Sequence, residues 1–457
     1  MSPIPHANAQ TPTSVELTEW DTQCPANNAA LSGLSLGNAQ TRQYAKTLRD
    51  RVDVRESWAG LEVESNSYVG RVDLGPIRIA IGPKLAAMPL AQLLRYTYGL
   101  RDVERSGKTE SPTSYQGFQD ILISLLAAEV GDLMRRGLAR KYRSRVQMLT
   151  SPRGEILVNE VIRQGGIREQ RLPCRFFERQ TDWNLNRILR TGVRFASTLA
   201  EDRDLRHELH YLEARFGDVQ PVSRLTTQGV EQAARALTRL TETSAAALTL
   251  IRLLLDAQGL TFTAANESTP TPGFLFDMNK FFQRLVSRFL RANLSGLRIE
   301  DEHSIRELLV FASDGNPRNR AAPMLRPDYA LFDGTKLRGF LDAKYRDIWS
   351  KGLPPTWLYQ LAMYALASPS QVSVLLYATM SNAARDERIE VRQPLRSSNV
   401  PPASVILRPV SLARLATLVN PLQAGELCAE RRKLAHLLVA LQSKPSGSDV
   451  TPPSVAG

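Results

Sequence analysis

Residues 325–349 read LRPDYALFDGTKLRGFLDAKYRDIW, and apolar and polar residues alternate on both sides of the Asp-Gly pair in this stretch. Alternation with a period of two predicts two β-strands, and the Asp-Gly pair predicts the turn between them. Asp328, Asp342 and Lys344 nevertheless lie inside the predicted strands, where Val or Thr would be usual. Two carboxylates and an ammonium in a sheet need a chemical reason, and this need constrains the fold more than any other feature.

The register of this hairpin decides whether the two carboxylates meet. Side chains two apart on a strand share a face, so Asp342 and Lys344 point the same way. A plain two-residue Asp-Gly turn would put Asp328 opposite Gly339 and leave the two acids on opposite faces. A connection of three or five residues shifts the pairing register by an odd number of residues and puts both acids on one face. We therefore predict an odd-numbered connection, because a single divalent cation needs both acids.

Two carboxylates and a lysine on one sheet face suit metal-assisted phosphodiester hydrolysis. A Mg²⁺ ion takes oxygen ligands, usually one or two carboxylates, here Asp328 and Asp342, together with substrate phosphate. The ion activates a water, while Lys344 orients that water or neutralises developing negative charge. The alternative is a structural ion pair between Asp342 and Lys344. The apolar flanks favour a site, because buried charges are costly unless they are paired or bind a metal.

Two predicted helices flank the hairpin. Residues 357–366, WLYQLAMYAL, carry Gln360 and Tyr364 four apart on one helical face, which could present them to DNA or to the water at the metal. The alternative is a polar edge on a core helix. The upstream helix FDMNKFFQRLVSRFL is expected to pack beside the sheet, and Gln283 occupies the position from which a glutamate would support the metal. Glutamine is a weaker, neutral ligand.

The hydrophobic period changes along the chain and divides it into regions. Short alternating runs come first, helical spacing follows, and the last part has the order helix, three strands, helix and strand, as in an α/β module. Stretches rich in Pro, Ser and Gly at both ends predict disorder. The predicted segments are a disordered tail at 1–13, a small β-rich N-terminal domain at 14–110, a mainly helical middle domain at 111–265, an α/β module at 266–443 and a disordered tail at 444–457.

The middle region carries three more specific predictions. Helices are expected at 184–199 and at 230–255, the second of them long and rich in Ala and Leu. The stretch 149–164, LTSPRGEILVNEVIRQ, predicts a strand-like insertion with a turn at Pro152–Gly154. The basic run at 135–145, RRGLARKYRSR, could follow a DNA backbone, meet an acidic face of a partner, or form a solvated helix end.

Charge indicates the kind of partner. The chain has 58 Lys and Arg against 46 Asp and Glu, a net charge of +12, which favours nucleic acid first and a membrane surface second. No run of 18 apolar residues occurs, and the polar N-terminus lacks the apolar core of a secretory signal. We therefore expect a cytoplasmic protein with no membrane partner.

Several of these motifs resemble those of a known family. RPDYAL followed by GFLDAKY resembles the PD-(D/E)xK nuclease motif, and the Gln360 and Tyr364 helix resembles the QxxxY element of its RecB-like branch. Over roughly residues 60–380 the chain resembles the McrC family, the nuclease subunit of McrBC modification-dependent restriction systems. The stretches that carry this resemblance are YVGRVDLGPIRIAIGPKL, SPRGEILVNEVIRQ, CRFFERQTDWNLNRILR and FDMNKFFQRLV.

The resemblance implies a type IV restriction-type DNA endonuclease. The α/β module would be a PD-(D/E)xK nuclease domain that cleaves DNA with Mg²⁺, Asp328 and Asp342 being the metal ligands and Lys344 the catalytic lysine. The β-rich and helical regions would engage a McrB-like AAA+ GTPase hexamer and stimulate its hydrolysis. That partner, rather than this chain, would recognise methylated cytosine in double-stranded DNA and translocate the DNA, and two assemblies that meet would trigger cutting.

Two other functions stay open at this point. Gln283 departs from the Glu that relatives often carry, which favours a degenerate nuclease that acts as a non-catalytic adaptor and activates the ring. An autonomous nuclease of the transposase or repair type is the third hypothesis. The β-rich and helical regions argue against it, because a bare nuclease needs neither.

Overall fold

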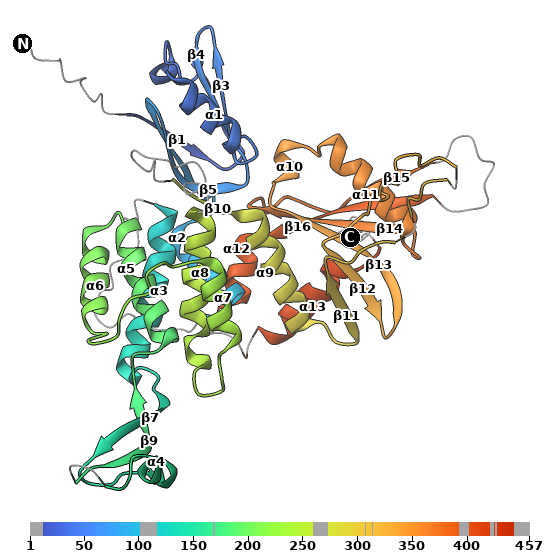
Figure 1. Ribbon diagram of the computed structural model, residues 1–457. Helices are drawn as coiled ribbons and strands as arrows, with labels where there is room; N and C mark the ends of the chain where they lie inside the picture. Colours follow the sequence, from blue (N-terminus) through green and yellow to red (C-terminus); the bar gives the residue numbers. More distant parts are fainter. Residues whose placement is uncertain are drawn as a thin grey trace, which may run out of the picture. The chain divides into compact units, whose positions relative to one another are not determined.

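The computed structural model describes residues 12–100, 117–167, 170–258, 273–306, 308–312, 314–392, 402–420, 425 and 427–442. The two predicted tails lie outside the described residues, apart from positions 12 and 13. The chain has a mixed α/β fold, and four sheets occur in the part that is described (Figure 1). Two compact units make up the chain: Met1–Thr97 with Leu275–Gly457 form the first, and Tyr98–Phe274 form the second.

The N-terminal part of the first unit is rich in short strands. Two sheets form it, with strand orders β1-β6-β5-β10 and β2-β4-β3. Alternate residues are buried along β6, as the period-two pattern predicts. The elements are β1 (Thr13–Thr18), β2 (Thr22–Gln23), α1 (Ala39–Leu48), β3 (Val52–Ser57), β4 (Gly60–Ser65), β5 (Tyr68–Leu74), β6 (Ile77–Gly82), α2 (Ala87–Tyr98) and β10 (Gly273–Asp277).

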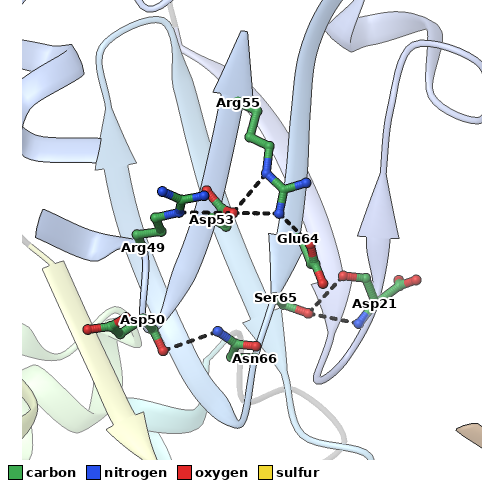
Figure 2. Close-up of polar contacts among 8 residues, drawn as sticks. All are labelled: Asp21, Arg49, Asp50, Asp53, Arg55, Glu64, Ser65 and Asn66. Carbon is green, nitrogen blue, oxygen red and sulfur yellow. Dashed lines mark hydrogen bonds and ion pairs between the residues drawn. The ribbon is translucent and has the colours of Figure 1, made fainter. Parts of the chain in front are cut away.

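Polar contacts fix the turn that links β1 to β2 (Figure 2). The Ser65 hydroxyl accepts a hydrogen bond from the Asp21 amide at 2.9 Å. The same hydroxyl donates one to the Thr18 carbonyl at 2.7 Å. On the neighbouring surface, Arg55 pairs with Asp53 at 2.6 Å and with Glu64 at 3.0 Å. Exposed ion pairs of this kind contribute little to stability. The Ser65 contacts matter more, because they anchor the residues on both sides of the turn.

The second unit is mainly helical, and its three-stranded sheet projects away from the helices (Figure 1). The helix predicted at 184–199 is confirmed. The single helix predicted at 230–255 is wrong, because the chain leaves helical geometry between α7 and α8. The elements are α3 (Phe118–Arg136), β7 (Lys141–Leu149), β8 (Glu155–Ile156), α4 (Val158–Arg163), β9 (Leu172–Gln180), α5 (Asn184–Leu199), α6 (Arg203–Ala214), α7 (Thr227–Arg235) and α8 (Ala245–Gln258).

Hydroxyl side chains account for the break between α7 and α8. The Thr241 hydroxyl accepts a hydrogen bond from the Thr238 amide at 2.8 Å, which offers the backbone an alternative to the helix. The insertion at 149–164 is also only partly strand-like, since its second half forms α4. The basic run at 135–145 is not one helix end: its first two arginines close α3 and pair with Asp132, whereas Lys141 begins the exposed strand β7.

The C-terminal part of the first unit is a six-stranded sheet with the order β11-β12-β13-β14-β16-β15. The order helix, three strands, helix and strand is confirmed. Helix α11 covers one face of the sheet and α9 packs against the other (Figure 1). The elements are α9 (Met278–Asn293), β11 (Leu297–Asp301), β12 (Tyr329–Asp333), β13 (Lys336–Lys344), α10 (Ile348–Lys351), α11 (Pro355–Ala367), β14 (Val372–Thr379), β15 (Glu387–Val391), β16 (Ala403–Ser411), α12 (Leu412–Leu418) and α13 (Cys428–Val439).

Candidate active site

The turn between β12 and β13 has an even number of residues. Asp333 pairs with Lys336, so the connection has two residues and the predicted odd-numbered connection is wrong. The register instead shifts between Leu331 and Phe332, where β13 contains one residue more than β12. This is a β-bulge, which lets one strand advance by one residue relative to its partner.

The bulge does what the odd-numbered connection was expected to do. Arg338 is the extra residue, and beyond it Tyr329 pairs with Leu341. Asp328, directly before β12, therefore lies opposite Asp342. Without the bulge it would lie opposite Leu341, and the two acids would point to opposite faces.

The predicted acids and lysine come together, and Gln283 joins them from α9. The Lys344 Nζ lies 2.8 Å from Asp342 Oδ2, and Asp342 is only 2% exposed. Asp328 Oδ2 accepts a hydrogen bond from the Ala343 amide at 2.7 Å, and Asp328 Oδ1 accepts one from Gln283 Nε2 at 3.0 Å. The backbone amide next to Asp342 thus holds the second carboxylate in place. We call Asp328, Asp342, Lys344 and Gln283 the acid-lysine site.

The acid-lysine site holds two carboxyl groups and one ammonium, and burial shifts the pKa of each acid. Burial and the neighbouring Asp342 charge raise the pKa of Asp328 to about 7. Burial also raises the pKa of Asp342. Burial by itself would lower the pKa of Lys344, but the charges of Asp342 and Asp328 outweigh it and the net shift is upward. One ammonium therefore faces two carboxylates, an arrangement that a further cation would stabilise.

Helix α11 lies on the same face of the sheet as Asp342. Pro354 is its N-cap and Pro355 its first residue, a position where a missing amide costs nothing. Gln360 Nε2 donates a hydrogen bond to the Tyr364 hydroxyl at 2.6 Å, and Tyr364 is fully buried against Phe340. Burial and the charge of Asp342 raise the pKa of Tyr364 far above its usual range, so the phenol stays neutral. Gln360 and Tyr364 therefore form one polar pair beside the acids.

The sequence patterns missed a group of residues that hold the end of β13. All three polar groups of Tyr345, the residue after Lys344, are bound. Its amide donates to Asn279 Oδ1 at 2.8 Å, its carbonyl accepts from Trp20 Nε1 at 2.7 Å, and its hydroxyl donates to Glu19 Oε1 at 3.1 Å. Trp20 and Tyr345 are 325 positions apart, so no local spacing relates them. Burial raises the pKa of Glu19 to about 7.

The donor atoms of the acid-lysine site suit a hard cation. The carboxylates of Asp328 and Asp342 are oxygen ligands, the kind that Mg²⁺ takes, and Mg²⁺ needs only one or two carboxylates when substrate phosphate completes its shell. The Gln283 amide directs its nitrogen at Asp328, so a turn of the amide would bring its oxygen to the same place. In the described part of the chain, no group of three His, Cys, Asp or Glu residues is arranged for a metal. The two acids and the neutral amide are therefore the complete set that these residues offer.

Comparison with known families agrees with the ordered motifs. Residues 63–378 match the model of the McrBC 5-methylcytosine restriction system component. The chain belongs to this McrBC family. The matched range agrees with the range of roughly 60–380 over which the motifs resemble McrC. A comparison with curated proteins finds no match.

Two solved structures resemble this McrBC family member. One is a chain of the refined half-complex from a tetradecameric assembly of Thermococcus gammatolerans McrB AAA+ hexamers with bound McrC: identity is 20%, the TM-score is 0.61, and the match covers 93% of this chain and 100% of that chain. The other is a chain of the cryo-EM structure of the Thermococcus gammatolerans McrBC complex, with 22% identity, a TM-score of 0.43 and coverage of 62% and 88%. At this identity the likeness concerns the fold. Among the helices described here, none has both the length and the apolar character that a membrane crossing requires.

Proposed function

We propose that the chain is the Mg²⁺-dependent DNA endonuclease subunit of a McrBC-type restriction system, with the six-stranded sheet, α9 and α11 as its PD-(D/E)xK nuclease module. The observation that carries this proposal is the convergence of Asp328, Asp342 and Lys344 on one face of the β12–β13 hairpin. A bulge and a buried ion pair maintain this arrangement. A sheet under no chemical demand would fill these positions with apolar residues.

Each residue of the acid-lysine site has a role in phosphodiester hydrolysis. Asp328 and Asp342 would hold Mg²⁺, with Gln283 as a neutral neighbour, and the ion would supply Lewis acidity toward the scissile phosphate. The Lys344 ammonium orients the attacking water or offsets charge on the phosphoryl oxygens. Gln360, which the buried Tyr364 hydroxyl holds in place, provides a polar group for DNA beside this centre.

We further propose that the chain binds a McrB-like AAA+ GTPase hexamer and stimulates its hydrolysis, while the partner recognises modified cytosine in double-stranded DNA. The fold is similar to that of a chain from an assembly of McrB AAA+ hexamers with bound McrC. The second unit offers a surface for a protein partner, since the projecting sheet and α4 expose apolar side chains that a free surface rarely groups together. These are Tyr142, Val146, Ile162 and Phe177.

Reconstitution tests the proposed function. The purified chain is mixed with a McrB-type GTPase, GTP, Mg²⁺ and methylated plasmid, and unmethylated plasmid serves as the control. We expect double-strand cutting only when every component is present, and its loss when a chelator removes Mg²⁺. GTPase stimulation without cutting would instead support the non-catalytic adaptor, which the neutral Gln283 favours. Cutting by the chain alone would support an autonomous nuclease.

Gln283→Glu tests the donor set directly. A third acid beside Asp328 and Asp342 adds repulsion in the free protein and a charged ligand for the ion. We expect a lower melting temperature in chelator, a larger rise with Mg²⁺, and Mg²⁺ affinity increased by about 10-fold, since ligand charge sets affinity. Thermal melting across a Mg²⁺ titration measures all three.

Gln147→Glu is the matched control for this prediction, since Gln147 is exposed on β7 in the second unit. That variant should respond to Mg²⁺ like the wild type. An unchanged Mg²⁺ response in Gln283→Glu would show that α9 contributes nothing to the ion site.

A further inference from the structure

We propose that Arg346 contacts a phosphate of the DNA beside the scissile bond, and that Trp20 from the N-terminal β region holds the Arg346 guanidinium in position for it. The inference rests on the proposed nuclease function and deepens it. Under this proposal, two parts of the chain build the DNA-binding surface. Trp20 of the N-terminal β region positions Arg346, which contacts DNA next to the proposed catalytic lysine.

Two indole rings hold the Arg346 guanidinium. Its central carbon lies 4.9 Å from the ring centroid of Trp20 and 5.7 Å from that of Trp357. The two rings meet edge to face, with centroids 6.5 Å apart. Cation–π contacts of this kind orient a planar guanidinium without consuming its hydrogen-bond donors. Arg346 is therefore fixed in direction while its terminal N–H groups stay available.

Arg346 forms no ion pair among the described residues. The acid whose charge acts on it, Glu64, is already paired with Arg55 at 3.0 Å, and the Arg346 Nε is buried without a hydrogen-bond acceptor. A half-buried cation in this state is costly, whereas the more deeply buried Arg408 is paired with Asp386. Phosphate oxygens would accept from the terminal N–H groups of the guanidinium, which match phosphate in both charge and geometry. The guanidinium is therefore placed and charged to bind an anion.

The position of Arg346 indicates which anion this is. Trp357 also contacts the proposed catalytic lysine, since the Lys344 Nζ lies 5.8 Å from its ring centroid. One indole thus separates the proposed catalytic ammonium from the guanidinium. A phosphodiester chain that passes the acid-lysine site also passes Arg346, so the expected ligand is a DNA phosphate adjacent to the scissile one.

Trp20 is held in a strained conformation that serves this arrangement. Its φ of +59° lies in the left-handed region, which is unfavourable for a bulky residue. Contacts on every side maintain it: its indole N–H donates to the Tyr345 carbonyl at 2.7 Å, its amide donates to the Asn66 carbonyl at 3.3 Å, and the next residue, Asp21, is bound by Ser65 (Figure 2). Strain that the surroundings preserve in this way is typical of functional sites.

The test measures DNA affinity and turnover separately. The full chain with its AAA+ partner, GTP, Mg²⁺ and methylated plasmid gives KM for DNA and kcat, and the chain alone with a fluorescent duplex in chelator gives the salt dependence of binding. We expect Arg346→Ala to raise KM by about 10-fold, to leave kcat within about 2-fold, and to reduce the salt slope by about one. Trp20→Ala should raise KM in the same direction, and Trp20→Phe less so, because a ring remains over the guanidinium.

Arg298→Ala is the matched control, because Arg298 also stacks on an aromatic ring, 4.3 Å from the Phe332 centroid, but is exposed and paired with Glu300. It should behave like the wild type. If Arg346→Ala does not fold, Arg346→Gln retains length and polarity without charge, and failure of both to fold would mark a structural role and overturn the proposal. A wild-type KM and salt slope in Arg346→Ala, or an equal effect of Arg298→Ala, would also overturn it.

The two proposals fail in different ways. A wild-type chain that never cuts, yet binds DNA in a manner that depends on Arg346, would refute the nuclease function and retain the contact. A wild-type chain that cuts, with Arg346→Ala unchanged in KM, would refute the contact and retain the nuclease. A fall in kcat at constant KM would also overturn the contact, because it would place Arg346 in the chemical step.

Discussion

In the reconstituted complex, Asp342→Asn is expected to reduce DNA cleavage by about 10³-fold or more, because several kcal/mol of transition-state stabilisation depend on the ion that this carboxylate holds. Asp342 lies at the centre of the acid-lysine site, opposite Asp328 and 2.8 Å from the Lys344 Nζ. The Asn side chain has the same shape, so the sheet is retained. Stimulation of the partner GTPase should therefore remain at the wild-type level. Plasmid cleavage and GTP hydrolysis, measured on the same complex, check both halves of the prediction.

Glu390→Gln is the control for this variant. Glu390 is an exposed carboxylate on the edge strand β15, bound to Arg392 at 2.8 Å and three strands away from β13 in the sheet. It should cut at the wild-type rate. Lys344→Met should reproduce the loss seen with Asp342→Asn, because the ammonium acts on the same transition state. Wild-type cutting by Asp342→Asn would remove the nuclease proposal and leave the adaptor.

The sequence predicts the relative positions of site residues correctly when those residues lie on the same strand. A period of two places Asp342 and Lys344 on one face with no knowledge of the rest of the fold. The position of Asp328 depends on how two strands pair. The prediction placed Asp328 and Asp342 on one face, as observed, but attributed this to an odd-numbered connection and not to a bulge. Alternation of residue types does not reveal a bulge, since Arg338 is an ordinary polar residue near a turn.

Sequence patterns did not predict contacts between residues far apart in the chain. Trp20 meets Tyr345 because two sheets of the first unit come together, and no periodicity encodes that meeting. The two predicted helices of the second unit differ in how well the sequence predicts them. The strongly amphipathic segment at 184–199 is a helix with the predicted ends, whereas 230–255 breaks where Thr238 and Thr241 hydrogen-bond to each other. Strong periodicity predicts an element well, and side-chain competition for the backbone interrupts it.

Residues beyond 385, for which the motifs predict nothing, contribute the last two strands of the sheet and a buried arginine. Arg408 on β16 is 1% exposed and forms an ion pair with Asp386 at 2.7 Å. Its guanidinium also donates to carbonyls at the C-terminal end of α13, including those of Leu437 at 2.7 Å and Ala440 at 2.6 Å. The last carbonyls of a helix have no partners within the helix, so Arg408 serves as the cap of α13.

Arg408→Met is accordingly expected to lower the free energy of unfolding by about 3–5 kcal/mol, the loss typical of breaking a buried ion pair from one side. The Met side chain fills much of the volume but leaves Asp386 and the carbonyls of α13 without donors. Because α13 packs against α9, which carries Gln283, DNA cleavage should fall as well. Chemical denaturation, followed by the change in helix signal, measures the loss of stability.

Two further variants decide whether the missing donors cause that loss. Arg388→Met removes an exposed arginine of the neighbouring strand β15, whose side chain donates to the Ser404 hydroxyl at 2.8 Å. Surface changes of this kind stay within about 0.5 kcal/mol. The double variant Asp386→Leu/Arg408→Met should recover part of the stability, because it no longer buries an unpaired carboxylate. Equal effects of Arg388→Met and Arg408→Met would show that α13 does not depend on its arginine cap.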